Sequence, residues 1–163
     1  MSIVIAVIGR SECPEDDTRT AEAVGRLVAQ KGAVLVCGGL TGVMEAACRG
    51  AREANGFTVG ILPGNDRRDA NPWVSLPIAT GVGQARNISV VRSSDAVIAV
   101  GGAYGTLSEI AFALNSAIPV VGIGSWRVSE RGAGPNPVYE AASPEEAVEI
   151  AFRLVSVKKE DSR

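Results

Sequence analysis

The sequence contains no histidine. Histidine supplies the base of Ser-His and Cys-His catalytic pairs and is the commonest protein ligand of metals, so its absence excludes these chemistries together. Lysine is almost as scarce and occurs only at Lys31, Lys158 and Lys159. Lys31 lies at the end of a predicted helix and the other two lie near the C-terminus. No lysine is therefore placed to form the Schiff base of a pyridoxal-phosphate decarboxylase.

The sequence also has few cysteines, no net positive charge and no long apolar run. The three cysteines, Cys13, Cys37 and Cys48, show no Cys-x-x-Cys spacing, which argues against a disulfide framework and against a metal site. A net charge of −2 argues against a nucleic-acid partner. No apolar run approaches the roughly 20 residues that cross a bilayer, and residues 1–5 lack the basic segment of a signal peptide. We therefore expect a cytoplasmic protein with no membrane partner.

What the sequence does contain is typical of one globular domain. Hydrophobic residues make up 46% and charged residues 21% of its 163 positions, enough to bury a core. We expect a single nucleotide-binding Rossmann-like domain over residues 1–157 and a polar tail over 158–163. Apolar runs predict strands at 3–8, 34–37, 57–62, 74–79, 96–100, 119–123 and 138–141. Amphipathic patterns predict helices at 14–31, 41–54, 84–93, 105–116 and 144–157. This alternation indicates an α/β fold with three layers, α/β/α, around a mostly parallel sheet.

Two glycine-rich junctions follow predicted strands, at residues 38–42 and 101–106. Glycine lets a ligand approach the backbone, and free N–H groups at a helix start attract anions. Because ligands bind beyond the carboxyl ends of parallel strands, we predict a phosphate site there. The alternative is that these glycines only permit tight turns and close packing. The candidate phosphate-binding residues are Gly9, Arg10, Gly38, Gly39, Thr41, Gly42, Gly101, Gly102, Ala103, Tyr104, Gly105 and Thr106.

Two charged residues are candidates for catalysis. Glu109 lies four residues after Gly105, where its carboxylate either enters the pocket or only favours the helix start. Arg86 lies in the first turn of a predicted helix, a position that is unfavourable for a cation unless an anion is near. A solvated arginine is an equal alternative on this evidence. Neither glycine run has the Gly-x-Gly-x-x-Gly or Gly-Lys-Ser/Thr pattern, so a dehydrogenase and a P-loop NTPase fit poorly.

Five motifs occur in a characteristic order: Gly38-Gly39-x-x-Gly42-Val43-Met44, Gly60-Ile61-Leu62-Pro63, Ala85-Arg86-Asn87, Ser94-Asp95-Ala96-Val97-Ile98-Ala99 and Tyr104-Gly105-Thr106-Leu107-Ser108-Glu109. From Ile3 to about Ile123 the chain resembles the LOG-type Rossmann family. That family includes cytokinin riboside 5′-monophosphate phosphoribohydrolases, molybdenum cofactor carrier proteins and chains mislabelled as lysine decarboxylases. The resemblance implies a catalytic pair at Arg86 and Glu109, a phosphate loop at 102–106, and a homodimer or homotetramer.

The chain departs from the phosphoribohydrolase signature at three positions. Gly101 stands in place of a proline, Ala103 in place of the second motif glycine, and Asn87 in place of a lysine. Ala103 brings a methyl group, and a bias against positive φ, into the turn that should surround the phosphate. These departures are more typical of the carrier and uncharacterised branch, so they favour binding over catalysis.

Three functions follow from these observations. The first is binding of a phosphate-bearing, nucleotide-like small molecule, either a nucleoside monophosphate such as AMP or the molybdenum cofactor, with no further cofactor required. The second is hydrolysis of the N-glycosidic bond of a nucleoside 5′-monophosphate, which leaves open whether the protein is an enzyme. The third is a non-catalytic oligomeric scaffold. Whether the Gly- and Pro-rich stretch 124–137 closes over a ligand is also left open.

Overall fold

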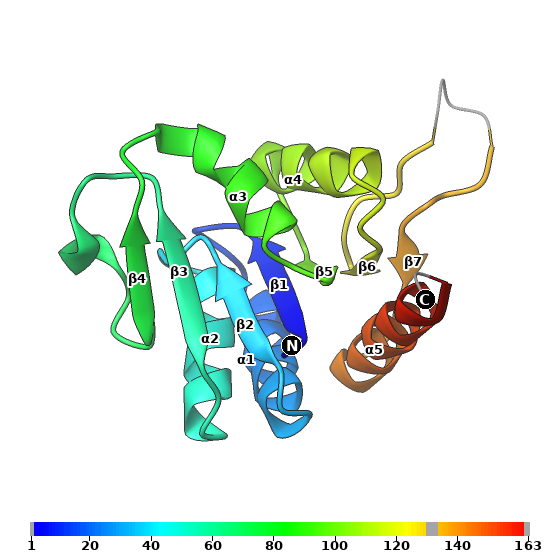
Figure 1. The fold of residues 1–163 in the computed structure, drawn as a ribbon, viewed down its shortest axis with the longest axis horizontal. Helices are drawn as coiled ribbons and strands as arrows, with labels where there is room; N and C mark the ends of the chain where they lie inside the picture. The colour runs from blue at the N-terminus through cyan, green and yellow to red at the C-terminus, as the bar shows by residue number, and fades with distance from the viewer. Residues whose placement is uncertain (1, 130–133, 162–163) are drawn as a thin grey trace.

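The computed structural model describes residues 2–129 and 134–161, which form one sheet of seven parallel strands covered by helices (Figure 1). The strands are β1 (Val4–Gly9), β2 (Val34–Cys37), β3 (Thr58–Leu62), β4 (Leu76–Ala79), β5 (Ala96–Val100), β6 (Val120–Ile123) and β7 (Tyr139–Glu140). The helices are α1 (Glu15–Gln30), α2 (Val43–Glu53), α3 (Asn87–Arg92), α4 (Tyr104–Asn115) and α5 (Pro144–Asp161), with 3-10 turns η1 (Arg67–Asp69) and η2 (Gly83–Arg86). The predicted Rossmann-like fold class is confirmed.

Two elements differ from the prediction. The helix predicted at 84–93 is divided into the 3-10 turn η2 and the short helix α3. Helix α5 continues to Asp161, so most of the stretch predicted as a polar tail is helical. In the predicted loop 124–137, residues 130–133 lie outside the described residues. None of the helices in the described part of the chain is long and apolar enough to cross a membrane.

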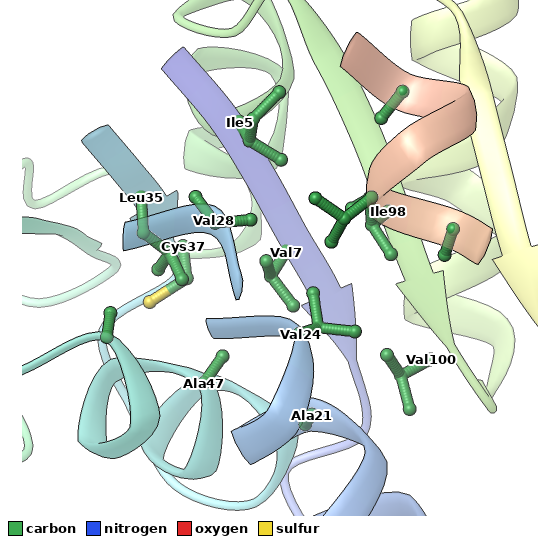
Figure 2. Packing of buried hydrophobic residues seen from close by; sticks show 14 of the residues in the cluster. Ile5, Val7, Ala21, Val24, Val28, Leu35, Cys37, Ala47, Ile98 and Val100 are labelled. Atoms are coloured by element: carbon green, nitrogen blue, oxygen red, sulfur yellow. The ribbon is translucent and has the colours of Figure 1, made fainter. Parts of the chain in front are cut away.

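The core lies on both faces of the sheet because side chains alternate along each strand. In β1, Ile5 and Val7 pack in one cluster with residues of α1, α2 and α5, whereas Ala6 and Ile8 pack in a second cluster with residues of α3 and α4. Figure 2 shows the first cluster, with Val24 of α1 beside the strand residues. Continuous apolar strands such as β1 are expected where a parallel sheet is buried on both faces.

The strand order is β4-β3-β2-β1-β5-β6-β7, so the chain first builds outward from β1 in one direction and then returns to its other side. The order therefore reverses between β1 and β5, the point where ligands bind in sheets of this kind. In the register of these two strands Gly9 pairs with Val100. Residues 10 and 101 consequently leave the sheet side by side.

The two outermost strands are short. Strand β4 contains Pro77, which pairs in register with Gly60 of β3, and β7 has only two residues. Proline cannot donate a backbone hydrogen bond, so within sheets it is confined mainly to edge strands, where one side of the strand has no neighbour.

Helices α1 and α2 approach each other closely at two glycines. A Cβ atom added to Gly25 would overlap the carbonyl oxygen of Ala47, and one added to Gly50 would overlap that of Glu22. Both obstacles are helix backbone and cannot rotate away. The pair of helices that covers one face of β1 therefore depends on two positions without side chains.

Substituting Gly25→Ala should lower the free energy of unfolding by about 1–3 kcal/mol, because the added methyl group forces the two helices apart. Gly105→Ala is the matched control, since nothing lies within 4 Å of its added Cβ and the backbone there has no positive φ. Its stability should stay within about 1 kcal/mol of the parent value. Denaturant unfolding of both variants measures the difference, and equal destabilisation would contradict the proposed close contact.

Candidate functional site

A cavity of about 570 Å³ opens at the carboxyl edge of the sheet, above β1 and beside the start of α4. Its wall combines backbone from the segment that follows β1, the start of the junction after β2, the turn η2 and the first half of α4. This volume lies within the range of small-molecule sites. The predicted catalytic candidates, Arg86 and Glu109, both line this cavity.

Arg86 is buried, with 8% of its surface exposed. Its Nη1 donates to Asn87 Oδ1 and its Nη2 donates to the Gly38 carbonyl at 3.3 Å. Its Nε is buried and has no hydrogen-bond partner among the described residues. Burial lowers the pKa of the guanidinium from its ordinary value, although the Glu109 charge acts in the opposite direction. A buried cation with an unused donor is a feature expected of an anion or acceptor site.

Glu109 is 7% exposed and accepts no hydrogen bond from any described residue. Burial raises the pKa of Glu109 to about 7, and the charge of Arg86 offsets only part of this rise. The two side chains form no direct ion pair, so a guest in the cavity can interact with both. At neutral pH the carboxyl group is close to its midpoint, a condition that suits proton transfer or recognition of a hydrogen-bond donor.

Arg10 joins the two loops at the reversal point of the sheet. Its Nε and Nη2 donate to the Gly102 carbonyl at 3.0 and 2.7 Å. The contact is possible because β1 and β5 end level with each other. Arg10 also lines the cavity, so its charge faces the same space as the start of α4.

The junction after β5 supplies the cavity's helix start. Ala103, Gly105 and Thr106 line the cavity, and Ala103, the N-cap residue of α4, makes no side-chain cap hydrogen bond to the first turn. The Thr106 hydroxyl accepts from the Ala103 N–H at 3.4 Å. Ala103 has a φ of −125°, an extended conformation open to any residue, so its methyl group does not disturb the turn as the sequence suggested. The first-turn amides of a helix have no partner within the helix, and Gly105 and Thr106, which supply two of them, line the cavity.

The other glycines of that junction face elsewhere. Gly101 and Gly102 have φ values of 56° and 140° and line a second cavity of about 530 Å³, together with Trp126. A Cβ on Gly101 would overlap the Asp17 carboxylate. Tyr104, which is 82% exposed, stacks on Trp126 with ring centroids 5.9 Å apart instead of lining the first cavity. These residues shape the turn and its rim.

The junction after β2 is largely occupied by internal contacts. The Thr41 hydroxyl donates to the Ser11 carbonyl at 2.9 Å, and the Gly39 N–H donates to Cys37 Sγ at 3.3 Å. Gly42 lies against the backbone of Arg10, where a Cβ would not fit. Of the predicted contacts in this junction only Gly38 lines the cavity. The two junctions therefore lie at the same edge but do not contribute equally.

Sequence reasoning missed two side chains that support the site. Asn87 accepts from Arg86 and is itself buried, yet in the sequence it stood out only as a departure from a motif. The Trp126 indole donates from Nε1 to the Ala103 carbonyl at 3.1 Å and so braces the turn before α4. Trp126 lies 23 residues from Ala103 in the sequence, so no local pattern predicted this contact. Among the described residues no group of three or more Cys, Asp or Glu side chains is arranged to hold a metal ion.

Comparison with known proteins identifies the family of this chain. A model of the SLOG cluster4 family matches residues 2–148. The chain belongs to this family. An uncharacterized protein of Archaeoglobus fulgidus is 47% identical to this chain over 151 residues, which span 88% of this chain and 91% of that protein.

Two solved structures resemble this SLOG cluster4 chain over nearly its whole length. A molybdenum cofactor binding protein of the phototrophic bacterium Rippkaea orientalis has a TM-score of 0.87 and 36% identity, with coverage of 95% of this chain and 98% of that one. The molybdenum cofactor carrier protein of Chlamydomonas reinhardtii has a TM-score of 0.85 and 34% identity, with coverage of 96% and 99%.

A plant enzyme is similar to part of this chain. The cytokinin riboside 5′-monophosphate phosphoribohydrolase LOG5 of Arabidopsis thaliana is 30% identical over 104 residues, which are 63% of this chain and 45% of the plant protein. The resemblance to LOG-type and carrier proteins that the motifs predicted is confirmed by these matches.

The raised pKa of Glu109 predicts a pH dependence of stability. Between about pH 4.5, the ordinary value, and about pH 7 the folded protein holds a proton that the unfolded chain releases. Stability should therefore fall as the pH rises through this window, by an amount on the order of 3 kcal/mol. The neutral variant Glu109→Gln should lack this loss. Urea unfolding at pH 5 and pH 8 measures it, and parallel changes in both proteins would contradict the assignment.

Proposed function

We propose that this protein binds a phosphate-bearing, nucleotide-like small molecule in the cavity between β1 and α4. The observation that carries the proposal is the buried Arg86, whose Nε has no partner, in the same cavity as an uncapped helix start. An ordinary structural role for Arg86 would use all of its buried donors. A guest that supplies an acceptor there would satisfy the group.

The phosphate would lie at the N-terminus of α4. The amides of the first turn have no side-chain cap, and nothing lies within 4 Å of a Cβ built on Gly105, so a phosphate oxygen can approach the backbone. Arg10, held over the same space by the Gly102 carbonyl, adds a positive charge. Backbone donors, the helix dipole and an arginine together are a common phosphate-binding arrangement.

The rest of the ligand would lie between Arg86 and Glu109. A carboxylate with no protein donor suits hydroxyl or ring N–H groups, and a guanidinium suits a carbonyl oxygen. Both kinds of group occur on nucleosides and on pterins. The Rippkaea and Chlamydomonas proteins are described as binding or carrying the molybdenum cofactor, so this pterin is a candidate ligand beside AMP.

Isothermal titration calorimetry with AMP, GMP and a phosphorylated pterin tests the proposal. At least one of them should bind, and Arg86→Gln should weaken binding at least tenfold, which is about 1.4 kcal/mol. Arg68→Gln is the matched control, because Arg68 is 90% exposed, pairs with Asp66 and does not line the cavity. Equal loss in both variants, or no heat with any of the three probes, would overturn the proposed site.

Hydrolysis of a nucleoside 5′-monophosphate is a second candidate, supported by the titration of Glu109. In a chain without histidine, leaving-group protonation had no obvious donor. A buried carboxyl group whose pKa is about 7 can hold a proton at neutral pH and release it. Glu109 would then protonate the departing base or stabilise the positive charge that develops on the ribose.

Chromatography of AMP after long incubation with the protein checks this candidate. Hydrolysis should yield the free base and ribose 5-phosphate, and Glu109→Gln should reduce the rate at least a hundredfold, a loss typical of removing a general acid. Binding of AMP by the same variant, measured in parallel, separates loss of chemistry from loss of affinity. Turnover that survives the substitution would show that Glu109 has no catalytic role.

Three further expectations remain predictions. The cytoplasmic location rests on sequence patterns, and the absence of a nucleic-acid partner rests on net charge. The homodimer or homotetramer rests on the family resemblance. A non-catalytic scaffold is a weaker alternative, because it gives no role to the unpartnered donor of Arg86 or to the buried carboxylate of Glu109.

A further inference from the structure

Two cysteine sulfurs lie in contact in the core, and one of them belongs to the residue before Gly38 of the cavity wall. Cys37 Sγ and Cys48 Sγ are 3.4 Å apart, and both residues are fully buried. Cys37 is the last residue of β2 and Cys48 belongs to α2, and Figure 2 shows Cys37 among the core residues between strand and helix. The third cysteine, Cys13, is partly exposed and contacts the Thr18 hydroxyl instead.

The distance between the two sulfurs is short enough for a bond after a small movement. A disulfide has an S–S length of about 2.05 Å, so the sulfurs need to approach by roughly 1.4 Å. At 3.4 Å no other atom can lie between them. The odd cysteine count hid this pair, because residues 37 and 48 are brought together only when α2 packs on β2.

We propose that Cys37 and Cys48 are a redox-modification site, at which a hydroperoxide such as hydrogen peroxide oxidises the two thiols to an intrachain disulfide. The Cys37 sulfur attacks one peroxide oxygen, and its thiol proton passes to the other oxygen of the peroxide. The O–O bond breaks, the other oxygen leaves as water, and Cys37 becomes a sulfenic acid. Cys48 then attacks the Cys37 sulfur, the S–S bond forms, and the hydroxyl group leaves with the Cys48 proton as a second water. One peroxide is reduced and two thiols are oxidised.

The surroundings favour Cys37 as the sulfur that reacts first. Its Sγ accepts the Gly39 N–H at 3.3 Å, which stabilises a thiolate. The hydrogen bond with Cys48 lowers the pKa of the Cys37 thiol, the Gly39 N–H lowers it further, and burial opposes both. The hydrogen bond with Cys37, together with burial, raises the pKa of Cys48. Cys37 also lies nearest to the cavity in sequence, since the next residue, Gly38, is part of the cavity wall.

The disulfide would change the shape of the cavity wall and so the affinity for the ligand, a consequence that rests on the proposed function. The Gly38 carbonyl accepts from Arg86, and a Cβ on Gly38 would lie only 2.5 Å from Arg86 Nη2, so this part of the wall has no slack. Met44 lines the cavity, and its carbonyl lies 3.9 Å from Cys37 Sγ. Drawing the sulfurs together shifts β2 against α2 and so moves Gly38 and Met44.

Mass spectrometry after peroxide treatment of the folded protein tests the disulfide. Cleavage at Glu45 separates Cys37 from Cys48, so only a disulfide keeps the two peptides joined. We expect the joined peptides, with the mass of two hydrogens lost, in the parent protein and in the control variant Cys13→Ser. They should be absent in Cys48→Ser and, where Cys48→Ser does not fold, in Cys48→Ala. Oxidation of Cys13 without joined peptides would overturn the proposal.

A second measurement separates this inference from the proposed function. Calorimetry with AMP is carried out on the reduced and on the oxidised protein, and we expect at least tenfold weaker binding after oxidation. By linkage, AMP should also shift the thiol–disulfide equilibrium toward the reduced protein. A disulfide without any change in affinity would overturn the coupling to the cavity. Failure of the reduced protein to bind AMP would count against AMP as the ligand and leave the disulfide result standing.

Discussion

The parallel pairing of β1 with β5 is the constraint on which the site depends. These strands are far apart in sequence, yet their register brings Gly9 level with Val100. From this single alignment Arg10 reaches the Gly102 carbonyl, and the start of α4 comes to lie over the end of β1. A displacement of one residue in the register would reverse the faces of β1 and separate the two loops.

Burial gives the cavity its chemistry. Arg86 and Glu109 each lie in the wall with less than a tenth of their surface exposed, and neither fully satisfies the other. Burial favours the uncharged form of each, which lowers one pKa and raises the other. Asn87 and the Gly38 carbonyl hold the guanidinium in place without neutralising it. The protein thus keeps two buried polar groups without a direct ion pair in the wall of one cavity.

Much of the fold could be predicted from local patterns, because apolar runs and helix-start signals depend only on residues close together in the sequence. The shared cavity of Arg86 and Glu109 was also anticipated, from motif resemblance. What could not be predicted depends on contacts between distant segments. Thr41 was expected to face a phosphate, yet its hydroxyl donates a hydrogen bond to the Ser11 carbonyl in the loop after β1. The bracing by Trp126 and the contact of the two buried cysteines likewise appear only when the elements pack.

The edges of the sheet restrict how copies of this chain could associate. A sheet normally grows between molecules when an unpaired strand offers a row of free backbone donors and acceptors. Here one outer strand is interrupted by Pro77 and the other, β7, is two residues long. Neither offers a ladder that another chain could extend. Assembly would have to proceed through helical or loop surfaces, and the same feature guards the protein against edge-to-edge aggregation.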